Sequence, residues 1–180
     1  FFFFFQEIRN LGQSACAQSA SACDIYFWMV SGYFDQSAEI KPLLHTWSLS
    51  VEEQLYMLFP VLLLGLRRVG FPLRVCALAV VWSLSLFWNI WSVNRYPELN
   101  FFLLPSRTWE LITGALVALA PPHAPSLSGR TSNLLATIGL ILVVASFIFI
   151  NPSMSFPGWV ALVPCVGTGW LIWVHGLQKT

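Results

Sequence analysis

The stretch "LLHTWSLSVEEQLYMLF", residues 43–59, places a histidine and two adjacent glutamates directly before unbroken apolar sequence. If one helix includes His45, the side chains of His45, Ser48, Glu52 and Tyr56 lie within about 40° of one line along it. A histidine can accept and release a proton near neutral pH, and a glutamate can orient it or stabilise its charged form. This face is suited to acyl transfer to a hydroxyl group, provided that it faces a protein interior or a wet cavity.

The same residues also have a purely structural interpretation. The sequence Ser50-Val51-Glu52-Glu53 fits a capping box, in which the Ser50 side chain accepts from the Glu53 backbone N–H and the Glu53 side chain reaches back. Acidic residues are also favourable in the first turn of a helix. In this alternative the helix begins at Ser50 and His45 lies in the preceding loop. The residue types alone favour capping, which contributes about 1 kcal/mol and requires no catalysis.

A second pair of charged residues lies inside a later apolar segment. Arg107 and Glu110 are spaced i, i+3, and Gly114 falls on the same helical face. A lone charge in a bilayer costs about 3 kcal/mol even on lenient scales, so such residues usually pair and face a functional interior. The alternative is that both lie near a helix end, with Arg107 extending to the lipid headgroups.

These residues lie in a chain with the composition of a membrane protein. Of its 180 residues, 57% are hydrophobic and only 9% are charged, against about 25% charged in ordinary soluble domains. The net charge of +1 gives no support for a nucleic-acid partner. The four cysteines lack the spacing of a metal site, although Cys16 and Cys23 could form a disulfide in an oxidising compartment.

Five apolar segments, each bounded by charge, proline or polar turns, are close to the length needed to cross a bilayer. The sequence predicts an all-α fold, a polytopic transmembrane helix bundle with about five membrane helices. The predicted spans are residues 49–66, 73–93, 101–120, 132–150 and 158–174.

The distribution of arginines predicts how this bundle is oriented. The loops at 67–74 and 121–131 carry most of the positive charge and are expected in the cytoplasm. Residues 6–42 are expected to form an external loop or irregular segment. The initial run of phenylalanines is too short to span a bilayer, so we expect it to end an earlier helix that is missing.

Three blocks of this sequence resemble the acyltransferase 3 family of bacterial integral-membrane O-acyltransferases. They are "GYFDQSAEIKPLLHTWSLSVEEQLYMLFPVLLL", "FFLLPSRTWELITGALVAL" and "FPGWVALVPCVGTGWLI". The resemblance is strongest to the subgroup that acetylates cell-surface sugars such as lipopolysaccharide O-antigen. It implies a bundle of about ten membrane helices that transfers an acyl group, usually acetyl from acetyl-CoA, to a carbohydrate hydroxyl across the membrane.

The resemblance, together with the polar helical face that includes Tyr56, suggests which residues form the site. We expect Glu52, Glu53 and His45 to be catalytic. The residues expected to line the substrate channel or support it are Trp47, Ser48, Gln54, Tyr56, Arg107, Trp109 and Glu110. No metal ligand and no bound cofactor is expected, because acetyl-CoA or another acyl-CoA acts as the donor substrate.

The family's best-known catalytic histidine and its arginine pair lie on earlier helices, which are absent here. Residues 1–180 are therefore expected to form a partial acyltransferase 3 domain that is inactive alone. The expected partners are the lipid bilayer, an acyl-CoA donor and a carbohydrate acceptor, in a multi-pass protein of the bacterial inner membrane. The alternatives are a transporter or channel segment, in which the intramembrane charges line a permeation path, and a structural membrane module.

Overall fold

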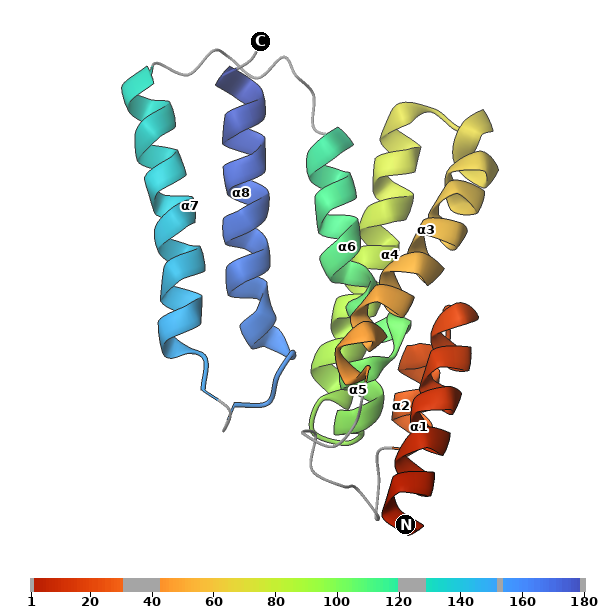
Figure 1. Cartoon of the computed structure of the whole chain (residues 1–180). Coiled ribbons are helices and arrows are strands. Elements are labelled where there is room, and N and C mark those ends of the chain that lie inside the picture. The colour runs from red at the N-terminus through yellow and green to blue at the C-terminus, as the bar shows by residue number, and fades with distance from the viewer. Residues whose placement is uncertain (1, 31–42, 120–128, 152–153, 179–180) are drawn as a thin grey trace.

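A computed structural model describes residues 2–30, 43–119, 129–151 and 154–178, and within these ranges the chain is helical with no strands (Figure 1). The α-helices are α1 (Phe2–Ser19), α2 (Cys23–Val30), α3 (Trp47–Gly65), α4 (Phe71–Ser92), α5 (Pro97–Phe102), α6 (Leu104–Leu119), α7 (Gly129–Phe149) and α8 (Leu162–Gln178). Short 3-10 turns lie at Leu44–Thr46 (η2), Leu66–Arg68 (η3) and Trp159–Ala161 (η4).

The long helices run up and down in sequence order, so that consecutive members are antiparallel (Figure 1). Helices α3, α4 and α6 lie together, α8 contacts α6, and α7 packs on α8. The short helix α2 contacts α3 near one end, and α1, with 18 residues, packs on α2. The prediction of an all-α membrane bundle is confirmed, and the protein is a multi-pass membrane protein.

Four described helices are long and apolar enough to cross a membrane, namely Leu44–Arg68, Phe71–Ser92, Arg130–Phe149 and Trp159–Gly176. They correspond to the first, second, fourth and fifth predicted spans. The third is divided, because Leu103 adopts an extended conformation between α5 and α6. Helix α6 continues from this break. With 16 residues, it is the shortest of the five up-and-down helices α3, α4, α6, α7 and α8.

A buried polar network joins α4 to this break. The Nδ2 of Asn89 donates to the Ser106 carbonyl at 2.9 Å, and the Nδ2 of Asn100 donates to the Asn89 carbonyl at 2.7 Å and to the Ser92 Oγ at 2.6 Å. The Ser85 Oγ donates to the Pro105 carbonyl at 2.6 Å. Because an unpaired backbone group is costly away from water, these side chains stabilise the interruption inside an apolar bundle.

The part of residues 6–42 that the structure describes is helical, so the prediction of an irregular segment is wrong there. Helix α1 includes the phenylalanines from Phe2 and continues to Ser19, so the prediction that this run ends a helix is wrong. A turn at Ala20–Ala22 reverses the chain into α2, whose Phe27 packs in a small core with Phe102. Cys16 and Cys23 are free and do not form a disulfide. Residues 31–42 lie outside the described ranges.

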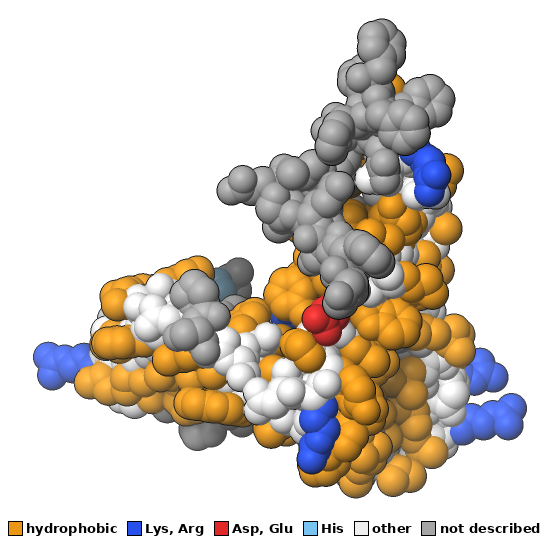
Figure 2. Space-filling model, turned by 90° about the horizontal axis from the view of Figure 1, so that it is seen from below, with side chains coloured by type: hydrophobic (Ala, Val, Ile, Leu, Met, Phe, Trp, Pro, Cys, Tyr) orange, Lys and Arg blue, Asp and Glu red, His pale blue; other side chains and the backbone are white. Residues whose placement is uncertain are grey.

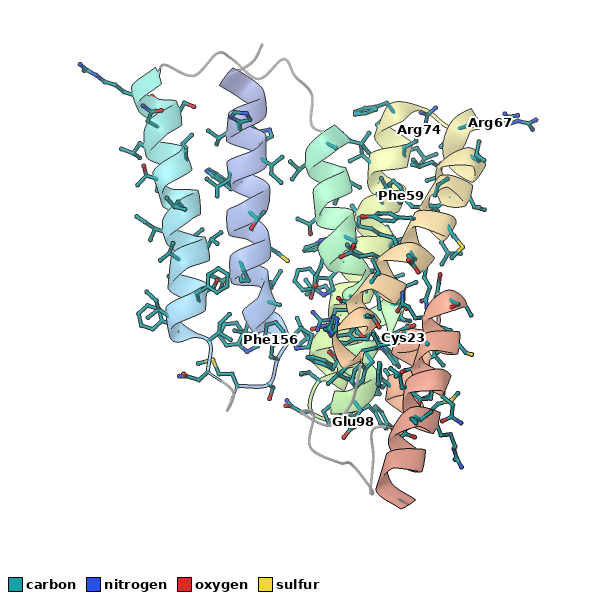
Figure 3. The ribbon with its side chains drawn as sticks, viewed as in Figure 1. Cys23, Phe59, Arg67, Arg74, Glu98 and Phe156 are labelled. Carbon is teal, nitrogen blue, oxygen red and sulfur yellow. The ribbon has the colours of Figure 1, made fainter. Side chains whose placement is uncertain are left out.

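The two ends of the bundle differ in their side chains. Arg67 and Arg74 lie at the end where α3 turns into α4, and Glu98 and Phe156 lie at the other (Figure 3). Helix α7 begins at the arginine end (Figure 1), so Arg130 in its first turn lies on the same side as Arg67 and Arg74. Residues 120–128 of the second predicted loop lie outside the described ranges. Viewed from the opposite end, the described surface is largely hydrophobic, with arginine groups around its edge (Figure 2).

Candidate functional site

Helix α3 begins at Trp47, and Ser50 lies inside it. Ser50 is fully buried; its Oγ accepts from the Cys23 backbone N–H at 3.2 Å and donates to the Gln18 Oε1 at 3.2 Å. The N-cap residue Thr46 makes no side-chain capping bond. The predicted capping box is therefore wrong. The Ser50 hydroxyl binds Gln18 of α1 and Cys23 of α2, and not the backbone of its own helix.

The predicted polar face of α3 is present but not enclosed by the described residues. His45, in the η2 turn, and Ser48 and Tyr56 are exposed, and Glu52 is half-buried. The Ser48 Oγ donates to the His45 carbonyl at 3.3 Å. No hydrogen bond joins the His45 and Glu52 side chains to one another or to any other group in the described ranges. Their assignment to catalysis stays a prediction.

Glu53 and Gln54 both bind the turn between α1 and α2. The Ser21 Oγ donates to the Glu53 Oε2 at 2.7 Å. The Nε2 of Gln54 donates to the Ser21 carbonyl and to the Asp24 Oδ1, both at 2.8 Å. Two neighbouring residues of α3 therefore hold this turn on the helix, and the sequence alone did not identify Ser21 as their partner.

Arg107 and Glu110 form the predicted ion pair within α6. The Nη1 of Arg107 lies 3.1 Å from the Glu110 Oε1 and 3.3 Å from its Oε2, and the side chains are only 11% and 22% exposed. The Nε of Arg107 also donates to the Phe101 carbonyl at 3.3 Å. The guanidinium contacts protein groups, and both residues lie in the first two turns of α6, near a helix end as the alternative expected.

Three aromatic rings surround this guanidinium. The Arg107 Cζ lies 5.1 Å from the ring centroid of Trp47, 5.3 Å from that of Phe101 and 5.6 Å from that of Phe156. These are cation–π distances, at which a ring face attracts a cation. Phe156 comes from the α7–α8 connection, at the end of the bundle opposite Arg67 (Figure 3). The three quoted sequence blocks therefore meet at one charged group.

Trp109 lies between Arg107 and Glu110 in sequence but points to another side of α6. It is fully buried and packs edge-to-face on Trp82, with ring centroids 6.4 Å apart. Both indoles border an apolar groove of about 310 Å³ between α4, α6 and α8, which Thr113 and Trp173 also line. Trp109 therefore supports the packing of α6. It is not one of the aromatic residues that lie over the Arg107 guanidinium.

Sequence reasoning missed Phe101 and Phe156 because a phenylalanine in an apolar chain carries no signal of its own. The Pro157-Gly158 pair that follows Phe156 could have indicated its position. Gly158 has φ +38, and a Cβ there would lie 2.7 Å from the Ser155 carbonyl oxygen. A sharp, glycine-dependent turn fixes the position of the residue just before it.

Comparison with known proteins gives relatives but neither a family model nor a solved structure that matches the chain. An uncharacterized protein of Haemophilus influenzae is 28% identical over 180 residues, which cover 94% of this chain and 74% of that protein. A protein of Komagataeibacter xylinus named "Putative membrane-bound transacylase BcsY" is 28% identical over 74% of this chain. A protein of Staphylococcus aureus named "Putative O-acetyltransferase" is 28% identical over 72% of this chain.

The chain spans only 34% of the length of the Komagataeibacter protein and 24% of the length of the Staphylococcus protein. Both matches nevertheless cover most of this chain, and one of the two names describes a membrane-bound protein. The chain is therefore similar to proteins that are named as a membrane-bound transacylase and an O-acetyltransferase, and this similarity supports an acyltransferase-like relationship.

Proposed function

We propose that this chain is part of a membrane O-acyltransferase that transfers an acetyl group to a hydroxyl of a cell-surface carbohydrate. The observation that carries the proposal is the meeting of Trp47, Arg107 and Phe156 around one partly buried ion pair. A charged pair inside an apolar bundle is costly, so such pairs usually mark functional sites. The two named relatives supply the class of reaction, acyl transfer.

In this proposal a glutamate of α3 handles the proton of the acceptor. Glu53 or Glu52 takes the hydroxyl proton while the hydroxyl oxygen attacks the thioester carbonyl of the acyl-CoA donor. The carbon–oxygen ester bond forms, the carbon–sulfur bond breaks, and coenzyme A leaves as its thiol after receiving a proton. His45 is a secondary proton-handling or positioning residue, and Arg107 with Glu110 shapes the wall of the channel.

The proposed location is the bacterial inner membrane. The end that carries Arg67, Arg68 and Arg74 would face the cytoplasm, as the positive-inside tendency favours, and this is the side where acyl-CoA is available. The end that carries His45, Glu98 and Phe156 would then face the carbohydrate acceptor. Residues 1–180 by themselves are proposed to be inactive, so expression of this piece alone in a host without surface acetylation should yield no acetylated sugar.

The test is made in the full reading frame that encodes the chain, expressed in a host that lacks surface O-acetylation. Glu53→Gln, Glu52→Gln and Arg107→Ala are compared with Glu98→Gln, an exposed glutamate at the same end of the molecule. We expect acetyl ester on the surface polysaccharide from the wild type and Glu98→Gln. At least one α3 glutamate variant should lose about 100-fold in rate, as removal of a general base does. Undiminished transfer by all three variants at normal protein levels would contradict the site assignment.

A further inference from the structure

We propose that Ser21 is a positioning residue for the Glu53 carboxylate, an inference that rests on the proposed function, in which an α3 glutamate takes the acceptor proton. Ser21 lies in the α1–α2 turn, which is far from α3 in sequence and in contact with it in space. Its role follows from its backbone conformation, from the bond that its hydroxyl makes and from the separate bonds that hold the turn.

The backbone of Ser21 has φ 52, in the left-handed region. This conformation costs a non-glycine residue about 1 kcal/mol, so the surroundings must maintain it. The Ser21 N–H donates to the Gln18 carbonyl at 3.0 Å, and the Ser21 carbonyl accepts from Gln54 at 2.8 Å. Strained residues of this kind are often found at functional sites, where the neighbouring structure fixes them.

This conformation directs the Ser21 hydroxyl to Glu53. The distance of 2.7 Å between the Ser21 Oγ and the Glu53 Oε2 is typical of a charge-assisted O–H···O bond. The bond occupies one carboxylate oxygen and restricts rotation of the carboxylate, while the Glu53 Oε1 has no hydrogen-bond donor in the described ranges. A general base requires a carboxylate that is held in place and has one oxygen free to accept the substrate proton.

The hydroxyl of Ser21 is not needed to hold the turn on α3. Gln54 binds the Ser21 carbonyl and Asp24, and Ser50 binds the Cys23 N–H. These bonds use the backbone of the turn or other side chains, so they survive when the Ser21 hydroxyl is removed. The hydroxyl can therefore be tested separately from the docking of α1 and α2.

The experiment uses two substitutions that both tolerate the left-handed backbone. Ser21→Gly keeps the conformation but has no donor, whereas Ser21→Asn tolerates it and supplies an amide N–H. Each is placed in the full reading frame in the organism that carries the gene, with Ser19→Ala as a control, since Ser19 is exposed and bonds only within α1. Membrane vesicles are supplied with labelled acetyl-CoA, and acetyl ester formed on the surface polysaccharide is measured.

We expect Ser21→Gly to lower kcat at least tenfold with the KM for acetyl-CoA and the thermal stability unchanged, because a misplaced catalytic group can cost about 100-fold. Ser21→Asn should recover most of this loss, and Ser19→Ala should match the wild type. A kcat for Ser21→Gly within twofold of the wild type would overturn the inference, as would equal losses in both variants accompanied by lower thermal stability. If the wild-type vesicles form no ester, the proposed function itself fails, which is a different result.

Discussion

The guanidinium of Arg107 lies over the indole of Trp47, with its Cζ 5.1 Å from the ring centroid. Trp47 is the first residue of α3 and Arg107 lies in the first turn of α6, so the contact joins the beginnings of two helices. Trp47 also packs on Phe101 and Phe102, with ring centroids 4.7 and 5.6 Å apart. Trp47 therefore connects α3, which carries Glu52 and Glu53, to the Arg107–Glu110 ion pair.

The first prediction concerns the ion pair between Arg107 and Glu110. Arg107→Leu leaves the Glu110 carboxylate, 22% exposed, without its partner and should lower the free energy of unfolding by about 3 kcal/mol. The double variant Arg107→Leu with Glu110→Leu should lose less than Arg107→Leu alone, because no unpaired charge is left. Equilibrium unfolding in mixed detergent micelles measures both. A double variant less stable than Arg107→Leu would show that the pair contributes net stability.

The spans could be predicted because charged residues, prolines or polar turns mark both ends of each apolar run. The first predicted span began at residue 49, and α3 begins at Trp47. The division between α5 and α6 was missed because the apolar run continues through it. Pro105 was the available signal, since proline is favoured in the first turn of a helix and disfavours a helix continuing into it.

The candidate site was predictable only in part. The Arg107–Glu110 pair followed from spacing and from the cost of charge in a bilayer. The failure at Ser50 has a different cause: local patterning predicted a cap, but long-range bonds to Gln18 and Cys23 take the hydroxyl instead. No local pattern reveals a partner about thirty residues away in sequence, so the Ser21–Glu53 bond required the fold.

The polar network at the α5–α6 break gives the second prediction. Asn100 is fully buried and bonds to the Asn89 carbonyl and the Ser92 Oγ. Asn100→Ala should lower the free energy of unfolding by about 2 kcal/mol, because buried polar groups lose their partner. Asn133→Ala, at an exposed position in α7, is the control and should stay within about 0.5 kcal/mol of the wild type. Equal stability of the two variants would contradict this role of Asn100.

The third prediction concerns the close approach of α7 and α8. A Cβ on Gly167 would lie 3.0 Å from the Val143 Cγ2 and 3.1 Å from the Gly139 carbonyl oxygen, whereas a Cβ on Gly114 meets nothing within 4 Å. Gly167→Ala should therefore destabilise the helix pair by about 1–3 kcal/mol. Gly114→Ala, the same change in α6, should be neutral or stabilising by about 0.5 kcal/mol. Thermal unfolding of both proteins in detergent compares them, and equal midpoints would contradict the close contact.

The fourth prediction concerns Asp24, which lies outside the membrane-spanning helices. Its Oδ1 accepts from Gln54 at 2.8 Å, and its Oδ2 is buried without a hydrogen-bond partner in the described ranges. Burial raises the pKa of Asp24 above its ordinary value of 3.8, although hydrogen bonds from the Ile25 N–H and Gln54 oppose this. The folded protein therefore binds the proton more tightly than the unfolded chain does.

A raised pKa of this carboxyl fixes the sign of the pH dependence. The contribution of Asp24 to stability is fully present below pH 3.8 and is lost as the pH rises through its folded-state pKa, because ionisation then favours the unfolded chain. Asp24→Asn keeps an oxygen for Gln54 and removes the charge, so it should be more stable than the wild type at neutral pH. The difference in unfolding midpoint should shrink as the pH falls toward 4, with Glu98→Gln as the exposed control. If Asp24→Asn is instead the less stable protein at pH 7, the carboxylate is stabilised in the fold, and the unpartnered Oδ2 has a donor that the described residues do not supply.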